Sequence, residues 1–103
     1  GGGRFPQVSG LRYTIDPAKP AGSRIVSVAV LDENGEYQPL DPAALYTVAS
    51  NDFMRQGGDG YTMLAENAVD AYDYGRPLDQ VVSDYIAAQS PVEIDLEGRI
   101  TIQ

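Results

Sequence analysis

Two side chains that carry much of protein chemistry are missing from this sequence, which has no cysteine and no histidine among 103 residues. Without cysteine there is no disulfide framework, no thiolate nucleophile and no zinc–thiolate site. Without histidine the chain lacks the commonest general base and transition-metal ligand, and every Ser–His or Cys–His dyad is excluded. A chain of this length makes one domain at most. We therefore predict a single domain over residues 1–103 that contains no catalytic residue.

Positive charge and long apolar runs are scarce as well. Lys and Arg number 7 against 15 Asp and Glu, which gives a formal net charge of -8. Such a field repels the phosphate backbone of nucleic acid and the surface of anionic membranes, so we expect neither as a partner. No apolar run approaches the roughly 18 residues needed to cross a bilayer, so we expect no membrane span.

The remaining composition is ordinary for a globular protein, with 43% hydrophobic and 21% charged residues. Alternating and β-branched apolar residues predict six strands, over residues 8–15 (with a break at Ser9-Gly10), 24–31, 37–40, 46–50, 92–96 and 99–102. Asn34-Gly35 predicts a hairpin turn, because such turns need positive φ angles.

One helix is predicted over about residues 77–89. Pro77 suits a first helical position, and Asp79 suits the first turn of a helix dipole. Five apolar residues at helical spacing are expected to face the core: Leu78, Val81, Val82, Tyr85 and Ile86. Residues 66–75 fit either a frayed helix or an extended segment. The predicted class is α+β, with mostly antiparallel strands and one principal helix.

The tetrapeptide Gly57-Gly58-Asp59-Gly60 is a candidate binding loop. Its glycines let a ligand approach the backbone closely and leave the Asp59 carboxylate accessible. Such a carboxylate can accept hydrogen bonds from two neighbouring hydroxyls, as in a ribose. From the tetrapeptide alone, an aspartate that caps its own turn is the more frequent case.

The chain has only two phenylalanines, Phe5 and Phe53, and both lie in segments predicted as loops. An apolar ring outside a periodic element either packs in a satellite core or stacks on a planar ligand. On the residues alone, packing is the more frequent alternative.

Two acidic clusters lack the ligand pattern of a metal site. Residues 32–36 do not have the alternating ligand positions of a calcium loop, and a solvated hairpin turn explains them. Asp70 and Asp73 have no third ligand nearby. We expect no metal and no cofactor in this chain.

Five segments resemble the C-terminal domain of the 5'-nucleotidase family, in order and at compatible spacing: residues 3–11 (GRFPQVSGL), 39–42 (PLDP), 46–53 (YTVASNDF), 57–61 (GGDGY) and 97–100 (EGRI). The resemblance runs nearly from end to end. That family comprises periplasmic or extracellular metallophosphoesterases, including UDP-sugar hydrolases, 2',3'-cyclic phosphodiesterases and ecto-5'-nucleotidases. The resemblance therefore implies a periplasmic or extracellular location for this protein.

The resemblance also implies roles for individual residues. In the family, an N-terminal domain holds two divalent metal ions and performs the hydrolysis, while the C-terminal domain binds the nucleoside. Phe5 and Phe53 would sandwich the base, and Asp59 would bind the ribose hydroxyls. Asn51 and Gly58 are secondary candidates, as polar or pocket-shaping neighbours. The expected function is that of a nucleotide-binding specificity domain, inactive alone, of a 5'-nucleotidase-like metallophosphoesterase.

The family's C-terminal domain begins well before Phe5, so the resemblance implies that this chain is its later part and that the metal domain lies elsewhere. The expected partners are a nucleotide or nucleoside and the parent's own N-terminal metal domain. Missing strands would leave an open sheet edge and uncovered apolar surface, which predicts a homo-oligomer or coverage by the parent. A stand-alone ligand- or protein-binding module without hydrolase activity is the alternative, and a fragment without binding ability is a third possibility.

Overall fold

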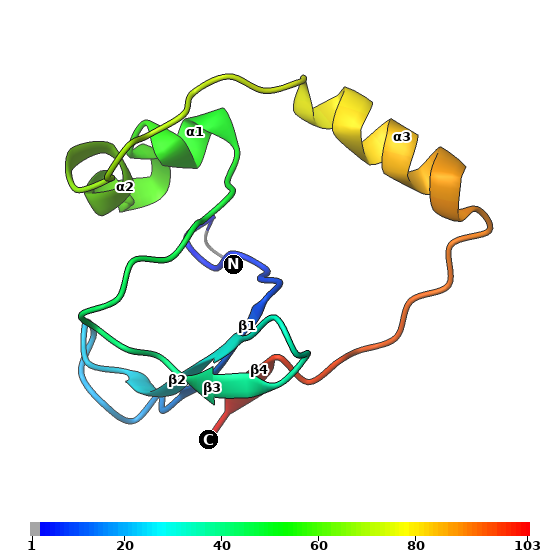
Figure 1. Cartoon of the computed structure of the whole chain (residues 1–103). Coiled ribbons are helices and arrows are strands. Elements are labelled where there is room, and N and C mark those ends of the chain that lie inside the picture. The colour runs from blue at the N-terminus through cyan, green and yellow to red at the C-terminus, as the bar shows by residue number, and fades with distance from the viewer. Residues whose placement is uncertain (1–2) are drawn as a thin grey trace. The chain divides into compact units, whose positions relative to one another are not determined.

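A computed structural model describes residues 3–103 of the chain (Figure 1). Its elements are β1 (Leu11–Ile15), β2 (Ile25–Leu31), β3 (Tyr37–Pro39), α1 (Asp52–Arg55), the short 3-10 helix η1 (Gly58–Gly60), α2 (Thr62–Glu66), α3 (Leu78–Gln89) and β4 (Ile100–Ile102). The predicted α+β class is confirmed.

The chain divides into two compact units. One comprises the residues up to Phe5 together with Tyr46–Ile94, and the other comprises Pro6–Leu45 together with Asp95–Gln103. Each unit is built from two separate stretches of sequence, so neither is a contiguous domain. The single-domain assignment stays a prediction.

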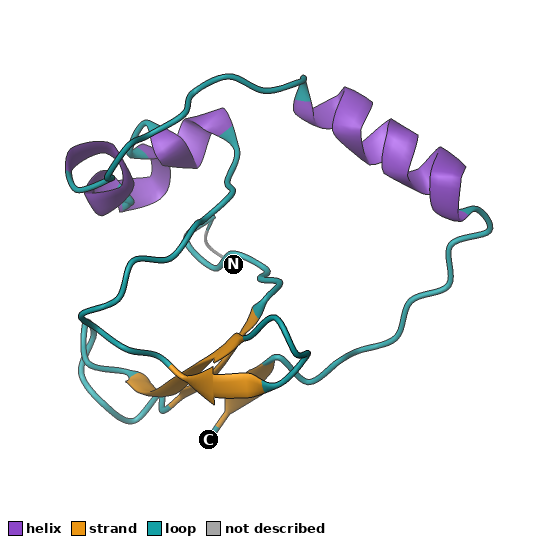
Figure 2. Cartoon of the chain, in the orientation of Figure 1, coloured by secondary structure: helices purple, strands orange, loops and turns teal. Residues whose placement is uncertain are grey.

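The second unit is a four-stranded sheet with the order β3-β2-β1-β4, drawn in orange in Figure 2. β1 pairs with β2 and β2 pairs with β3, both antiparallel, as short connections allow. β4 instead lies parallel to β1, with Tyr13 opposite Ile100. A parallel partner needs a long connection, and here residues 16–99 separate the two strands. The sheet is therefore mostly antiparallel, as expected.

The turn between β2 and β3 is organised by one carboxylate. Asp32 accepts hydrogen bonds from the backbone N–H groups of Asn34 and Glu36, each at 2.9 Å, and from the Gln38 side chain at 3.2 Å. The Glu36 N–H is the largest cause that lowers the pKa of Asp32, against an opposing effect of desolvation. This support for the hairpin is therefore complete above the ordinary Asp pKa, and is lost as the pH falls through the lowered value. Gly35 has φ +81°, whereas Asn34 has no positive φ.

Several predicted boundaries are wrong. Residues 46–50 and 92–96 form no strand, because neither segment pairs with an edge of the described sheet. Residues with high β-propensity are not stabilised as a strand unless a neighbouring strand pairs with them. The first strand begins only at Leu11, after the predicted break. Pro77 is the residue that precedes α3 rather than its first helical residue. Residues 67–77 are irregular, apart from bends, and this resolves the ambiguity over the segment 66–75.

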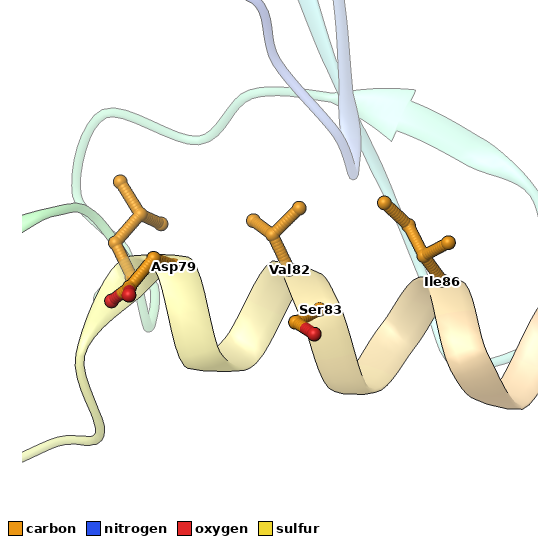
Figure 3. Close-up of a pocket in the computed structure, with 5 residues that line it drawn as sticks. Asp79, Val82, Ser83 and Ile86 are labelled. Atoms are coloured by element: carbon orange, nitrogen blue, oxygen red, sulfur yellow. The ribbon is translucent and has the colours of Figure 1, made fainter.

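The apolar stripe of α3 does not face a core in the described part of the chain. Leu78, Val81, Val82, Tyr85 and Ile86 keep between 46% and 62% of their surface exposed, so that expectation is wrong. Val82 and Ile86 project from the same face of this helix (Figure 3). The surface beside them is shallow and open, because residues of α3 alone line it. A 3.6-residue period identifies the side chains that share a face, but not what covers them.

Among residues 3–103, no hydrophobic side chain is fully buried. Uncovered apolar surface is therefore present, while its coverage by a second copy or by a parent protein stays a prediction. None of the described helices is long and apolar enough to cross a membrane.

Candidate functional site

The loop from Gly57 to Tyr61 forms the centre of the candidate site. Gly57 has φ +95°, which ends α1 sharply, and the Tyr61 N–H donates to the Gly58 carbonyl at 3.1 Å. Asp59 itself has φ 54° and ψ 24°, a left-handed conformation that aspartate tolerates better than most residues. Non-glycine residues in this region cluster at functional sites, where the surrounding structure holds them.

Phe53 reaches this loop from a short helix rather than from the predicted loop. α1 has four residues and depends on its cap, because the Asn51 side chain accepts a hydrogen bond from the Met54 N–H at 2.9 Å. The side chain of Asn51, a secondary candidate for the pocket, therefore caps the helix that carries Phe53. A further hydrogen bond from Gln56 N–H to the Asp52 carbonyl, at 3.0 Å, completes the turn.

The Phe53 ring packs directly against Gly58. A Cβ atom on Gly58 would lie 2.5 Å from the Phe53 carbonyl oxygen and 2.6 Å from two ring carbons, so only glycine fits there. Phe53 nevertheless keeps 56% of its surface exposed. Gly58 therefore supports one side of the ring, and the remaining surface is free to contact a ligand.

Arg55 joins α1 to the segments that follow it. Its guanidinium donates to the Leu64 carbonyl at 2.8 Å and forms an ion pair with Asp73 at 2.8 Å. Asp73, one of the acidic pair considered for a metal, is therefore the partner of an arginine. Among residues 3–103, no group of three or more His, Cys, Asp or Glu side chains could hold a metal ion. The described residues do not fit the two divalent ions that the resemblance implies for the family's N-terminal domain.

The segment that carries Phe5 lies across the Asp59 loop. A Cβ atom on Gly3 would lie 2.7 Å from Oδ2 of Asp59, so the main chain passes close to this carboxylate. The Tyr61 hydroxyl donates a hydrogen bond to the Arg4 carbonyl at 2.7 Å, across 57 residues of sequence. The Arg4 guanidinium lies along Gly60, where a Cβ atom would be 3.1 Å from it. Phe5, the next residue, is 48% exposed.

The five residues that the sequence nominated thus belong to one compact unit: Phe5, Asn51, Phe53, Gly58 and Asp59. The arrangement offers two exposed aromatic rings and a carboxylate that can only accept hydrogen bonds when ionised. That combination suits a planar ligand with adjacent hydroxyl groups. Their roles in binding stay predictions.

Sequence reasoning missed the contacts that join these residues. Gly3, Arg4 and Tyr61 all lie in the family motifs, but the resemblance implies no role for any of them. The sequence does show an aromatic residue, Tyr61, directly after Gly57-Gly58-Asp59-Gly60. No feature of the neighbouring sequence indicates that its hydroxyl donates a hydrogen bond to Arg4.

Comparison with known proteins agrees with the motifs. The family model described as "5'-nucleotidase, C-terminal domain" matches residues 1–66, more than half of the chain. A 5'-nucleotidase of Diplobatis ommata is 39% identical over 101 residues, covering 95% of this chain and 17% of the relative. The snake venom 5'-nucleotidase of Macrovipera lebetinus is 36% identical over 104 residues, covering 98% and 25%.

The crystal structure of a 5'-nucleotidase precursor from Thermus thermophilus has 48% identity to this chain and a TM-score of 0.88. The match covers 97% of this chain and 20% of the Thermus thermophilus chain. The chain thus spans a quarter or less of the length of each of these relatives. The resemblance noted in the sequence is confirmed, and the chain belongs to the 5'-nucleotidase C-terminal domain family.

Proposed function

We propose that this chain is the nucleotide-binding specificity part of a longer 5'-nucleotidase-type phosphoesterase. The observation that carries the proposal is the gathering of Phe53, Asp59 and the Phe5 segment around one loop. The relatives compared above are 5'-nucleotidases by name, which supports an enzyme as the parent protein.

In this proposal the two phenylalanine rings stack on the nucleobase. Stacking contributes about 1–3 kcal/mol per base and tolerates any base, because every base has a π-face. Base selectivity should therefore be loose. Selectivity for the sugar should be strict, because the two carboxylate oxygens of Asp59 would accept hydrogen bonds from the ribose diol. Asn51 and Gly58 act indirectly, through the helix and the contact that hold Phe53.

The charge of the chain suits the nucleoside end of a substrate. A net charge of -8 is unfavourable for phosphate, so the phosphate groups would be bound by the parent's N-terminal domain, where two divalent metal ions are expected. That domain would be the principal protein partner. A periplasmic or extracellular location is part of the proposal. It is supported by a relative described as a snake venom 5'-nucleotidase, since venom is a secretion.

The test compares the full-length protein with residues 1–103 alone, by measuring phosphate released from nucleoside 5'-monophosphates. We expect the full-length protein to release phosphate and to stop when a chelator removes its divalent metals, whereas the chain alone should release none. Turnover by the chain alone would contradict the division of labour. A full-length protein without phosphoesterase activity would favour the alternative, a stand-alone binding module.

Gly58→Ala is a second test, directed at the support of Phe53. The added Cβ would lie 2.5 Å from a backbone oxygen, which cannot move as a flexible side chain would, so Phe53 must shift. We expect KM of the full-length protein for a nucleoside 5'-monophosphate to rise about 5- to 50-fold, within the range of a lost stacking contact. Gly75→Ala is the matched control, since nothing lies within 4 Å of a Cβ there. Equal KM values for the two variants would contradict the role of Gly58.

A further inference from the structure

We propose that Tyr61 is a positioning residue for Asp59, because its hydroxyl joins the turn that carries Asp59 to the main chain of Arg4. The proposal rests on the proposed function insofar as Asp59 binds the ribose of the substrate. The carrying observation is that residues 59, 60 and 61 each meet the segment formed by Gly3 and Arg4.

The turn that carries Asp59 needs support from outside itself. Its backbone has positive φ at three of four consecutive positions, with φ 95° at Gly57, 54° at Asp59 and 82° at Gly60. Glycine adopts this region freely, whereas an aspartate there is held in a sparsely populated conformation. Such a residue persists where the surrounding structure determines its backbone. The direction of the Asp59 side chain therefore depends on whatever fixes the turn.

Gly3 and Arg4 supply that support through three contacts with successive residues of the turn. A Cβ atom on Gly3 would lie 2.7 Å from Oδ2 of Asp59, so the main chain rests against this side chain. The Arg4 guanidinium lies along Gly60, 3.1 Å from the position of a Cβ atom there. The third contact is the 2.7 Å hydrogen bond from the Tyr61 hydroxyl to the Arg4 carbonyl. A hydrogen bond depends on direction as well as distance, so this contact fixes the orientation of the segment against the turn.

This support leaves the carboxylate of Asp59 available to a ligand. Within residues 3–103, no hydrogen bond or ion pair engages the Asp59 side chain, which is exposed. Asp32 shows the contrasting case, since its carboxylate organises its own turn by accepting hydrogen bonds from the N–H groups of Asn34 and Glu36. At Asp59 the turn is instead held from outside by the Tyr61 hydroxyl. Loss of that hydroxyl should therefore alter the aim of the carboxylate without removing it.

The first experiment measures order in the turn without any nucleotide. The Tyr61 N–H closes the turn by donating to the Gly58 carbonyl at 3.1 Å. In Tyr61→Phe of the full-length protein, we expect this amide to exchange hydrogen about 3- to 10-fold faster, as for the loss of one hydrogen bond. Tyr72→Phe is the matched control, because Tyr72 keeps 80% of its surface exposed and its ring is retained. Unchanged exchange in Tyr61→Phe would overturn the proposal, whatever the protein's substrate.

The second experiment asks whether the effect is confined to the sugar. Tyr61→Phe is expected to raise KM for a nucleoside 5'-monophosphate about 3- to 10-fold, with kcat within twofold of wild type. Binding of a 2',3'-dideoxynucleoside 5'-monophosphate should change less than twofold, because this ligand lacks the hydroxyls that Asp59 would accept. An equal loss for both ligands would indicate a general loosening of the site and would overturn the proposal.

A double-mutant cycle then tests whether Tyr61 acts through Asp59. In an Asp59→Asn background, Tyr61→Phe should change KM less than twofold, whereas in a Phe53→Ala background its effect should persist. An undiminished effect in the Asp59→Asn background would show that Tyr61 does not act through Asp59. Faster exchange in a full-length protein that hydrolyses no nucleotide would establish the support of the turn and refute the proposed function instead.

Discussion

Replacing Asp59 by alanine in the full-length protein is expected to raise KM for a nucleoside 5'-monophosphate by roughly 10- to 150-fold while leaving the bound metal content unchanged. The physical reason is the loss of a charged acceptor for two hydroxyl groups. Hydrogen bonds to charged groups contribute about 1.5–3 kcal/mol, and each 1.4 kcal/mol corresponds to a tenfold change in affinity. Steady-state kinetics and a metal assay on the same preparation measure both quantities.

Two controls separate the carboxylate from the backbone that carries it. Asp59 has φ 54°, so alanine adds backbone strain there, whereas asparagine tolerates this conformation. Asp59→Asn should therefore retain the loop and still raise KM, by less than the alanine variant. On the substrate side, a 2',3'-dideoxynucleotide should bind wild type and Asp59→Asn about equally. An Asp59 variant that still discriminates against the dideoxynucleotide as wild type does would refute the assigned role.

Replacing Phe53 by alanine should raise KM by about 5- to 150-fold, with similar losses for purine and pyrimidine substrates. Removing one stacking face costs about 1–3 kcal/mol per base, and stacking is tolerant of base identity. The loss of stability should be small, because Phe53 keeps 56% of its surface exposed. Measured dissociation constants for a substrate analogue should follow KM, since the contact exists before the chemical step.

Phe53→Tyr is the matched control, because it retains an aromatic face at the same position. We expect its KM to remain within a few-fold of wild type. A loss confined to one base would point to a hydrogen-bonding role for this region rather than stacking. A fall in kcat at unchanged KM would place Phe53 in the chemical step, contrary to the proposal.

Local pattern was a reliable guide where the determining interactions are themselves local. The β2–β3 hairpin forms around Gly35, and Asp32 bonds only to residues within six positions of itself. The 12-residue helix α3 follows the period of its apolar residues and begins after a proline. Local pattern failed for residues 46–50, because strand formation depends on a partner edge that the segment itself cannot specify.

The candidate site divides in the same way. The motifs that contain Phe5, Phe53 and Asp59 could be identified from residue types, order and spacing. Their support could not, because the bond from Tyr61 to Arg4 spans 57 residues and joins a hydroxyl to a backbone carbonyl, which no side-chain pattern encodes. The contact between Gly58 and the Phe53 ring likewise requires the positions of both segments in space.

The order of residues was sufficient to predict the α+β class, the hairpin, the position of α3, the family and the residues nominated for binding, because propensity, periodicity and motif order are properties of neighbouring residues. Three features became known only from the folded chain: Phe53 lies on a capped helix, β4 runs parallel to β1, and the Gly3–Phe5 segment crosses the Asp59 loop. These features arise from contacts between segments far apart in the chain, where steric fit and hydrogen-bond partners become defined only on folding.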